Sequence, residues 1–219
     1  MTLHDRPRDD PGHELAELRA MVADGRAELA VSRLRRLLQD EPHQGEAQAL
    51  LGATLLSLHQ PEEALRAADA AIAHQSDHAE GHHLRARVLL QLGQPAPALA
   101  SARAATAREP LVPSYQKALV RAALAAGSLE DAAAGAAALS RLEPGEADGR
   151  LAEAEVSRRQ GHLDRAGQLA DSLCSSHPDH PGVRRLVHAV EADRAAAPPA
   201  HQPDRRRPPG RWWDRLRRR

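Results

Sequence analysis

The stretch Gln60-Pro61-Glu62-Glu63-Ala64-Leu65-Arg66-Ala67-Ala68 contains one copy of a pattern that recurs through most of the 219 residues. The central alanine belongs to a series spaced at intervals of 34 residues: Ala30, Ala64, Ala98, Ala132 and Ala166. Two further series keep this interval, namely Pro42, Pro110, Pro144 and Pro178 with Ser76 in the gap, and Gly25, Gly93, Gly127 and Gly161 with His59 in the gap. A fixed period of 20–50 residues is typical of proteins whose repeats stack into a solenoid.

The copy that starts at Pro113 predicts the structure of one repeat. Residues 114–126 carry an apolar stripe at helical spacing, so they are expected to form a helix. Gly127 can end this helix because glycine readily takes the left-handed conformation. Ser128, with an aspartate three residues later, is the expected N-cap of a second helix over 129–142. Each repeat is therefore predicted to be a helical hairpin.

In these features the chain resembles the tetratricopeptide repeat (TPR) family over about residues 11–197. The small residue of the family's first helix is matched by Gly52, Ala86 and Ala154, and the alanine that opens its second helix by the alanine series. The chain departs from the family in lacking core aromatic residues, whose place is taken by leucine and alanine. The resemblance implies an all-α, right-handed superhelical solenoid of antiparallel helix hairpins with a C-terminal capping helix.

The period also predicts how the chain is divided. Residues 1–10 are expected to be a disordered lead, and 181–197 a capping helix with a polar outer face. A Pro/Arg-rich disordered tail with a short amphipathic Trp-Trp segment is expected over 198–219. Five TPR-like repeats are expected over 11–180, with these bounds: 11–44, 45–78, 79–112, 113–146 and 147–180.

Composition indicates the compartment. Cys174 is the only cysteine, so no internal disulfide can form, and a small buried apolar role is expected for it. No leader-like or membrane-spanning apolar segment is recognisable, which predicts a cytoplasmic protein. Asparagine is absent and lysine occurs once, whereas alanine and arginine abound; this bias is typical of a GC-rich bacterial genome.

The resemblance also implies a binding surface, because the first helices of stacked TPR hairpins line a concave groove in which the family binds peptides. The groove candidates, in register with that pattern, are His83, Arg87, Lys117, Arg121, Leu124, Arg158 and Arg159. Their basic character favours an acidic peptide or a C-terminal carboxylate. The alternative is that these are ordinary solvated faces of an arginine-rich chain.

The tail is a second candidate for interaction. Residues 194–219 hold nine arginines and two aspartates, a net charge of +7, which leaves −7 for the rest of the neutral chain. On a helix, two tryptophans and a leucine would share one face with arginines around them. Its candidate residues are Arg211, Trp212, Trp213, Arg215 and Leu216. Such a segment suits weak contact with an anionic membrane, or docking on a protein, its own acidic body included. Nucleic acid is the least favoured partner, and a solubilising tail without any partner is the remaining alternative.

The search for chemistry is negative. The chain has no P-loop, dinucleotide-binding, zinc-protease or nucleophile-elbow motif, so no catalytic residue and no cofactor are predicted. The cluster of His74, His78, His82 and His83 is expected to be solvated loop histidines rather than a metal site.

The sequence therefore predicts a non-enzymatic protein–protein interaction scaffold or adaptor. The alternatives are an assembly factor held at the inner membrane by its tail, and a regulatory subunit that touches nucleic acid through the tail arginines.

Overall fold

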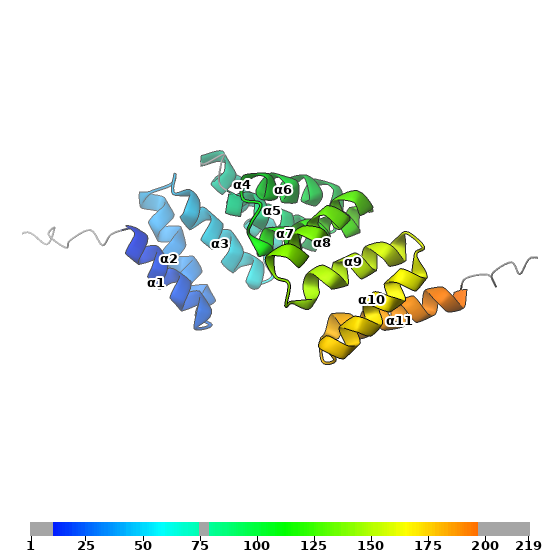
Figure 1. Ribbon diagram of the computed structural model, residues 1–219. Coiled ribbons are helices and arrows are strands. Elements are labelled where there is room, and N and C mark those ends of the chain that lie inside the picture. Colours follow the sequence, from blue (N-terminus) through cyan, green and yellow to red (C-terminus); the bar gives the residue numbers. More distant parts are fainter. Residues whose placement is uncertain (1–10, 75–78, 197–219) are drawn as a thin grey trace, which may run out of the picture.

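The computed structural model describes residues 11–74 and 79–196, which form eleven helices and no strand (Figure 1). The helices have these bounds: α1 (Pro11–Ala23), α2 (Ala27–Asp40), α3 (Gly45–Ser57), α4 (Pro61–His74), α5 (Ala79–Gln91), α6 (Pro95–Arg108), α7 (Pro113–Ala126), α8 (Leu129–Leu142), α9 (Ala147–Arg159), α10 (Leu163–Ser176) and α11 (Pro181–Ala196). They confirm the predicted all-α solenoid of helix hairpins. The expected N-terminal lead, the Pro/Arg-rich tail with its five candidate residues, and His78 lie outside the described residues.

The turns inside the hairpins depend on one backbone conformation. Gly127 follows α7 with a φ of 78°, and the amide of Ser128 donates to the carbonyl of Ala123 at 2.9 Å. The other three glycines of the 34-residue series also have positive φ, as predicted for helix ends. His59, which fills the gap in the series, has a φ of 59° and is the only described non-glycine residue with positive φ. Position in the repeat therefore fixes the conformation even where the residue changes.

The predicted N-cap at Ser128 is only half right. Ser128 does precede α8, but its side chain makes no hydrogen bond to the backbone of that helix. Its hydroxyl donates instead to the carboxylate of Asp131, which also accepts two hydrogen bonds from Arg103 of α6. The charged guanidinium draws the aspartate into an inter-helix ion pair, and the serine follows it rather than capping α8.

The core is built on close approach of small residues. All five alanines of the 34-residue series have no solvent exposure. At Gly52 a Cβ would lie 2.6 Å from the side chain of Leu84 and 3.1 Å from the carbonyl oxygen of Ala64, so even one methyl group would collide there. Leucines that fill the space between hairpins, Leu34, Leu84, Leu139 and Leu173, are fully buried. Leucine and alanine thus replace the aromatic core residues of the family pattern.

The expected burial of Cys174 is wrong, because this residue is exposed on α10. The preceding residue, Leu173, has no exposure and fills the inward position. Consecutive residues on an α-helix point about 100° apart, so Cys174 is turned away from the core.

Candidate functional site

The odd-numbered helices form a continuous inner layer. Each of them packs closely against the next odd-numbered helix from α1 to α11, whereas successive even-numbered helices lie further apart and are joined by ion pairs of long side chains, such as that of Arg103 on α6 with Asp131 on α8. The array therefore curves with the odd-numbered helices on its inside, and α1 and α11 lie at its opposite ends (Figure 1). A concave surface of this kind is where solenoid proteins expose their binding residues.

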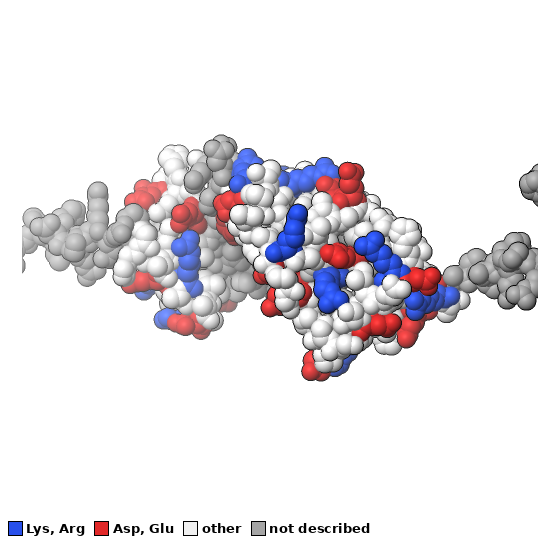
Figure 2. Space-filling model, viewed as in Figure 1, with Lys and Arg blue, Asp and Glu red and all other residues white. Residues whose placement is uncertain are grey.

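Charge on the described surface is mixed. Figure 2 shows acidic and basic side chains intermingled over the face in view, with no extended patch of one sign. The individual ion pairs therefore decide which predicted groove cations are available to a partner.

Lys117 of α7 is already neutralised within the chain. Its ammonium lies 2.8 Å from a carboxylate oxygen of Asp148 and 3.0 Å from one of Glu143. These two hydrogen bonds raise the pKa of Lys117. A partner carboxylate would have to displace both acids.

Arg158 and Arg159 are held by their own helix and its neighbours. Both guanidinium groups donate to Glu155 one turn earlier, at 2.7 to 2.9 Å. Although burial favours its neutral form, these hydrogen bonds dominate and lower the pKa of Glu155. Arg158 also pairs with Asp193 of α11 at 2.5 Å, and Arg159 donates to the carbonyl of the half-buried Leu124 at 2.6 Å. These contacts join α7, α9 and α11 and occupy both arginines.

His83 is not a surface contact, although it was predicted among the groove residues and among solvated histidines. It is 7% exposed, and its ring centre lies 4.8 Å from that of Tyr115. Burial, helped by the positive charge of Arg87, lowers the pKa of His83 to about 4, so the imidazole is neutral at neutral pH. The hydroxyl of Tyr115 donates to Glu80 at 3.0 Å, which ties α5 to α7. Sequence register places His83 on the right helix but does not reveal that Tyr115 covers it.

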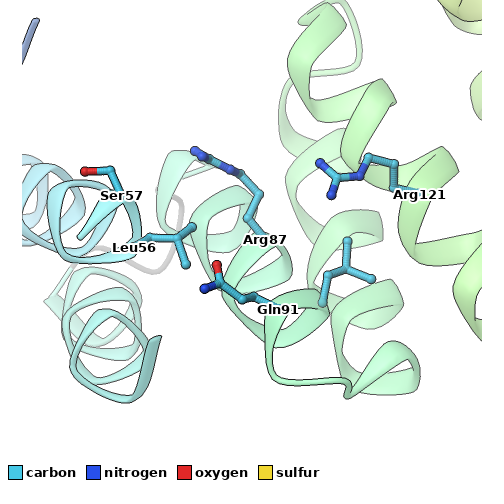
Figure 3. A pocket seen from close by; sticks show the side chains of 6 residues that line it. Leu56, Ser57, Arg87, Gln91 and Arg121 are labelled. Atoms are coloured by element: carbon cyan, nitrogen blue, oxygen red, sulfur yellow. The ribbon is translucent and has the colours of Figure 1, made fainter. Parts of the chain in front are cut away.

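Arg87 and Arg121 differ from the other predicted cations. Both are exposed, and neither has a carboxylate partner among the described residues. They line a cavity of about 350 Å³ on the inner layer, between the end of α3 and helices α5 and α7. The rest of its lining consists of Leu56, Ser57, Leu90 and Gln91. Figure 3 shows Arg121 extending from α7 toward the side of the cavity where Arg87 lies.

The prediction from the sequence did not include the apolar residues of this cavity, although the 34-residue register indicates them. Leu124 was predicted in the groove, and residues 34 and 68 positions before it are Leu90 and Leu56. Leu56 is buried and Leu90 half-buried, so they form an aliphatic floor beneath the two arginines. Following the register of Leu124 through the other repeats would have found both.

A second cavity of about 320 Å³ lies toward the start of the inner helices. Its charged lining is Arg19, Glu46 and Glu80, beside small and aliphatic residues of α3. Arg19 and Glu46 pair with each other at 3.3 Å, and Glu80 accepts the Tyr115 hydroxyl. Its charged groups are thus engaged with one another or with the fold.

Within residues 11–74 and 79–196, no three metal-ligating side chains converge on one point. None of the helices in these ranges combines the length and the apolar content needed to span a bilayer.

Comparison with known proteins gives one consistent result. Models of the tetratricopeptide repeat match residues 21–88, 83–140 and 117–181, which together make up most of the chain. No curated protein matches the chain in sequence.

Solved structures with the same fold include YrrB, described as a TPR protein with an unusual peptide-binding site. It is 19% identical at a TM-score of 0.67, over 81% of this chain and 88% of YrrB. MamA is 14% identical at a TM-score of 0.63, over 87% of this chain and all of that chain. PilF of Pseudomonas aeruginosa is 19% identical at a TM-score of 0.67, over 83% and 84% of the two chains. At these identities the likeness concerns the fold alone.

Proposed function

This chain belongs to the tetratricopeptide repeat family, whose fold supports a protein–protein interaction scaffold, and we propose that it holds a segment of a partner protein in the concave surface of its inner layer. The cavity between α3, α5 and α7 carries this proposal. It lies on the inner layer, has an aliphatic floor, and is bordered by two arginines that no carboxylate of the described chain occupies. The peptide-binding site in the description of YrrB offers a precedent in this fold.

The shape and lining of the cavity favour a peptide segment over a small metabolite. It is partly open to solvent and partly polar, and its walls come from three successive inner helices. Small-molecule sites are usually deeper and bury most of the ligand, whereas grooves take side chains of an extended or helical segment. The proposed activity is therefore binding without catalysis. The cytoplasmic location and the bacterial source remain predictions from the sequence.

Filling the cavity tests the proposal. Ser57 and Gln91 are exposed residues of its lining, so Ser57→Trp/Gln91→Trp should occlude it with little effect on the core. Gln168→Trp, on an exposed position of the outer helix α10, is the matched control. The full chain and both variants are used to capture partners from source-cell lysate. We expect the partner to be lost with the filled cavity and retained with the control; retention by both variants would place binding elsewhere.

A further inference from the structure

We infer that the partner segment presents an acidic side chain to Arg87 and Arg121 jointly, next to an aliphatic side chain that packs on Leu56 and Leu90. This inference rests on the proposed function and names the chemistry of its ligand. Of the basic residues predicted in the groove, it assigns contact with the ligand to these two arginines.

The first step excludes those predicted cations that already pair with a carboxylate of the chain. Of the five cations predicted to contact a ligand, Lys117, Arg158 and Arg159 each lie within 3.0 Å of a carboxylate of the chain. Arg87 and Arg121 have no such partner among the described residues, so a ligand carboxylate meets no competing acid there. Guanidinium groups donate two parallel N–H hydrogen bonds to a carboxylate, which makes an arginine pair without an internal partner a suitable binding site for an acidic group.

The second step explains why these two arginines stay free. Arg87 and Arg121 are 34 residues apart, so they occupy equivalent places on the adjacent helices α5 and α7. The same place holds Ala53 on α3 and Glu155 on α9. The alanine offers no charge, and the glutamate is engaged by two arginines of its own helix. Within residues 11–74 and 79–196, the repeat therefore leaves two positive charges without an acidic partner on adjacent helices in the middle of the groove.

The third step concerns the floor of the cavity. Leu56 and Leu90 lie in equivalent places on α3 and α5, and both line the cavity that the arginines border. A volume of about 350 Å³ accommodates one or two side chains, at the lower end of the usual range for ligand pockets. An aliphatic residue next to an acidic one on the partner would fill this space and place its carboxylate at the arginines.

The fourth step distinguishes a role of Arg87 and Arg121 in ligand binding from a role in the stability of the fold. Two like charges in register on neighbouring helices repel each other, and the positive charge of Arg87 also acts on the buried His83. Removing Arg87 and Arg121 should therefore leave the melting temperature unchanged or raise it. A structural ion pair would show the opposite behaviour, because its loss leaves a carboxylate unpaired.

The test uses the full chain and fluorescein-labelled peptides of the sequence Gly-Glu-Leu-Glu-Leu-Gly, in which two Glu-Leu pairs offer the proposed chemistry. One companion peptide carries glutamine in place of glutamate, and another carries phosphoserine. The protein variants are Arg87→Gln/Arg121→Gln and, as a control of equal charge, Arg66→Gln/Arg141→Gln on the exposed outer face. Affinity is measured by fluorescence polarisation at low and high salt, and stability by thermal melting.

We expect the glutamate peptide to bind the unchanged chain in a salt-sensitive manner and to lose about tenfold in affinity on Arg87→Gln/Arg121→Gln, since two exposed charge contacts of about 0.7 kcal/mol each correspond to that factor. The control variant should bind as the unchanged chain does. Equal binding of the glutamine peptide, no binding of either peptide, or the same loss in the control variant would overturn the inference. Binding of the phosphoserine peptide at least tenfold tighter than the glutamate peptide would also overturn it, in favour of a phosphorylated ligand.

The outcome is separable from that of the proposed function. If cavity filling removes the natural partner while Arg87→Gln/Arg121→Gln retains it at full affinity, the groove binds the partner but not through an acidic group. If neither change affects the partner, the proposed function fails as well.

Discussion

The burial of His83 predicts a pH dependence of stability. In the folded chain its pKa is lowered to about 4 by burial and by the charge of Arg87, whereas in the unfolded chain it is near 6.5. Between these two values the unfolded chain binds more protons than the folded chain, so stability falls as the pH decreases through this window. Above about pH 7 the imidazole is neutral in both states, and the effect vanishes.

The magnitude follows from the two pKa values. Linkage with values of 6.5 and about 4 gives a loss of about 2 kcal/mol between pH 7.5 and pH 5, and about 3 kcal/mol once the pH is below 4. The loss arises because a proton must enter a site that is 7% exposed, packed on Tyr115, and close to a guanidinium group. Such a loss is a large part of the stability of a domain of ordinary size.

The comparison of His83→Leu with the unchanged chain isolates this effect. Urea unfolding is followed by circular dichroism at pH 7.5 and pH 5, with His188→Leu on the exposed side of α11 as the control. The free energy of unfolding of the unchanged chain and of the control should fall by about 2 kcal/mol more than that of His83→Leu. Equal pH dependence in all three proteins, or an NMR titration of the His83 ring near pH 6.5, would refute the reasoning.

Three further predictions concern packing and exposure. Gly149→Ala should destabilise the chain by about 1–3 kcal/mol in urea unfolding, because a Cβ there lies 2.6 Å from the backbone nitrogen of Ser140. Gly145→Ala, where a Cβ meets nothing within 4 Å, is its control and should not destabilise; equal effects would contradict the packing argument. Arg158→Gln should lower stability by about 1.5–3 kcal/mol through loss of the ion pair between α9 and α11, and an unchanged melting temperature would show that this pair is dispensable. Cys174 should react with a thiol reagent in the native chain as fast as in urea, whereas protection would mean that it is covered in solution.

The sequence predicted the fold well because the fold depends on short-range and periodic features. The alanine series marks where two backbones approach, and every member of it is fully buried. The glycine series marks a left-handed turn residue, and this held even at His59, where the residue type gave no indication. Both features depend only on position within the repeat, so the pattern of one repeat predicts them in every other repeat.

The candidate site could be predicted only as far as the helix that carries each residue. The register of the repeat placed Lys117 and Arg121 on the same helix. It did not predict that Lys117 would pair with Asp148 of the next repeat while Arg121 pairs with no acid in the described part of the chain. Long charged side chains reach partners several residues away in any direction, so their pairing depends on the curvature and spacing of the hairpins. For the same reason His83 could be placed on α5, but not beneath Tyr115.

The proposed binding surface lies where the repeat changes from copy to copy. The alanines at the start of the second helices cannot vary, because any larger side chain at a site with no exposure, such as Ala98, would force the hairpin apart at about 1–3 kcal/mol. The equivalent place on the inner layer passes from Ala53 to Arg87, Arg121 and Glu155, and the two arginines there are exposed to solvent. Under the proposed function, a substitution at Arg87 should therefore change what is bound while the fold is preserved, whereas a large residue at Ala98 should destabilise the solenoid without acting on the ligand directly.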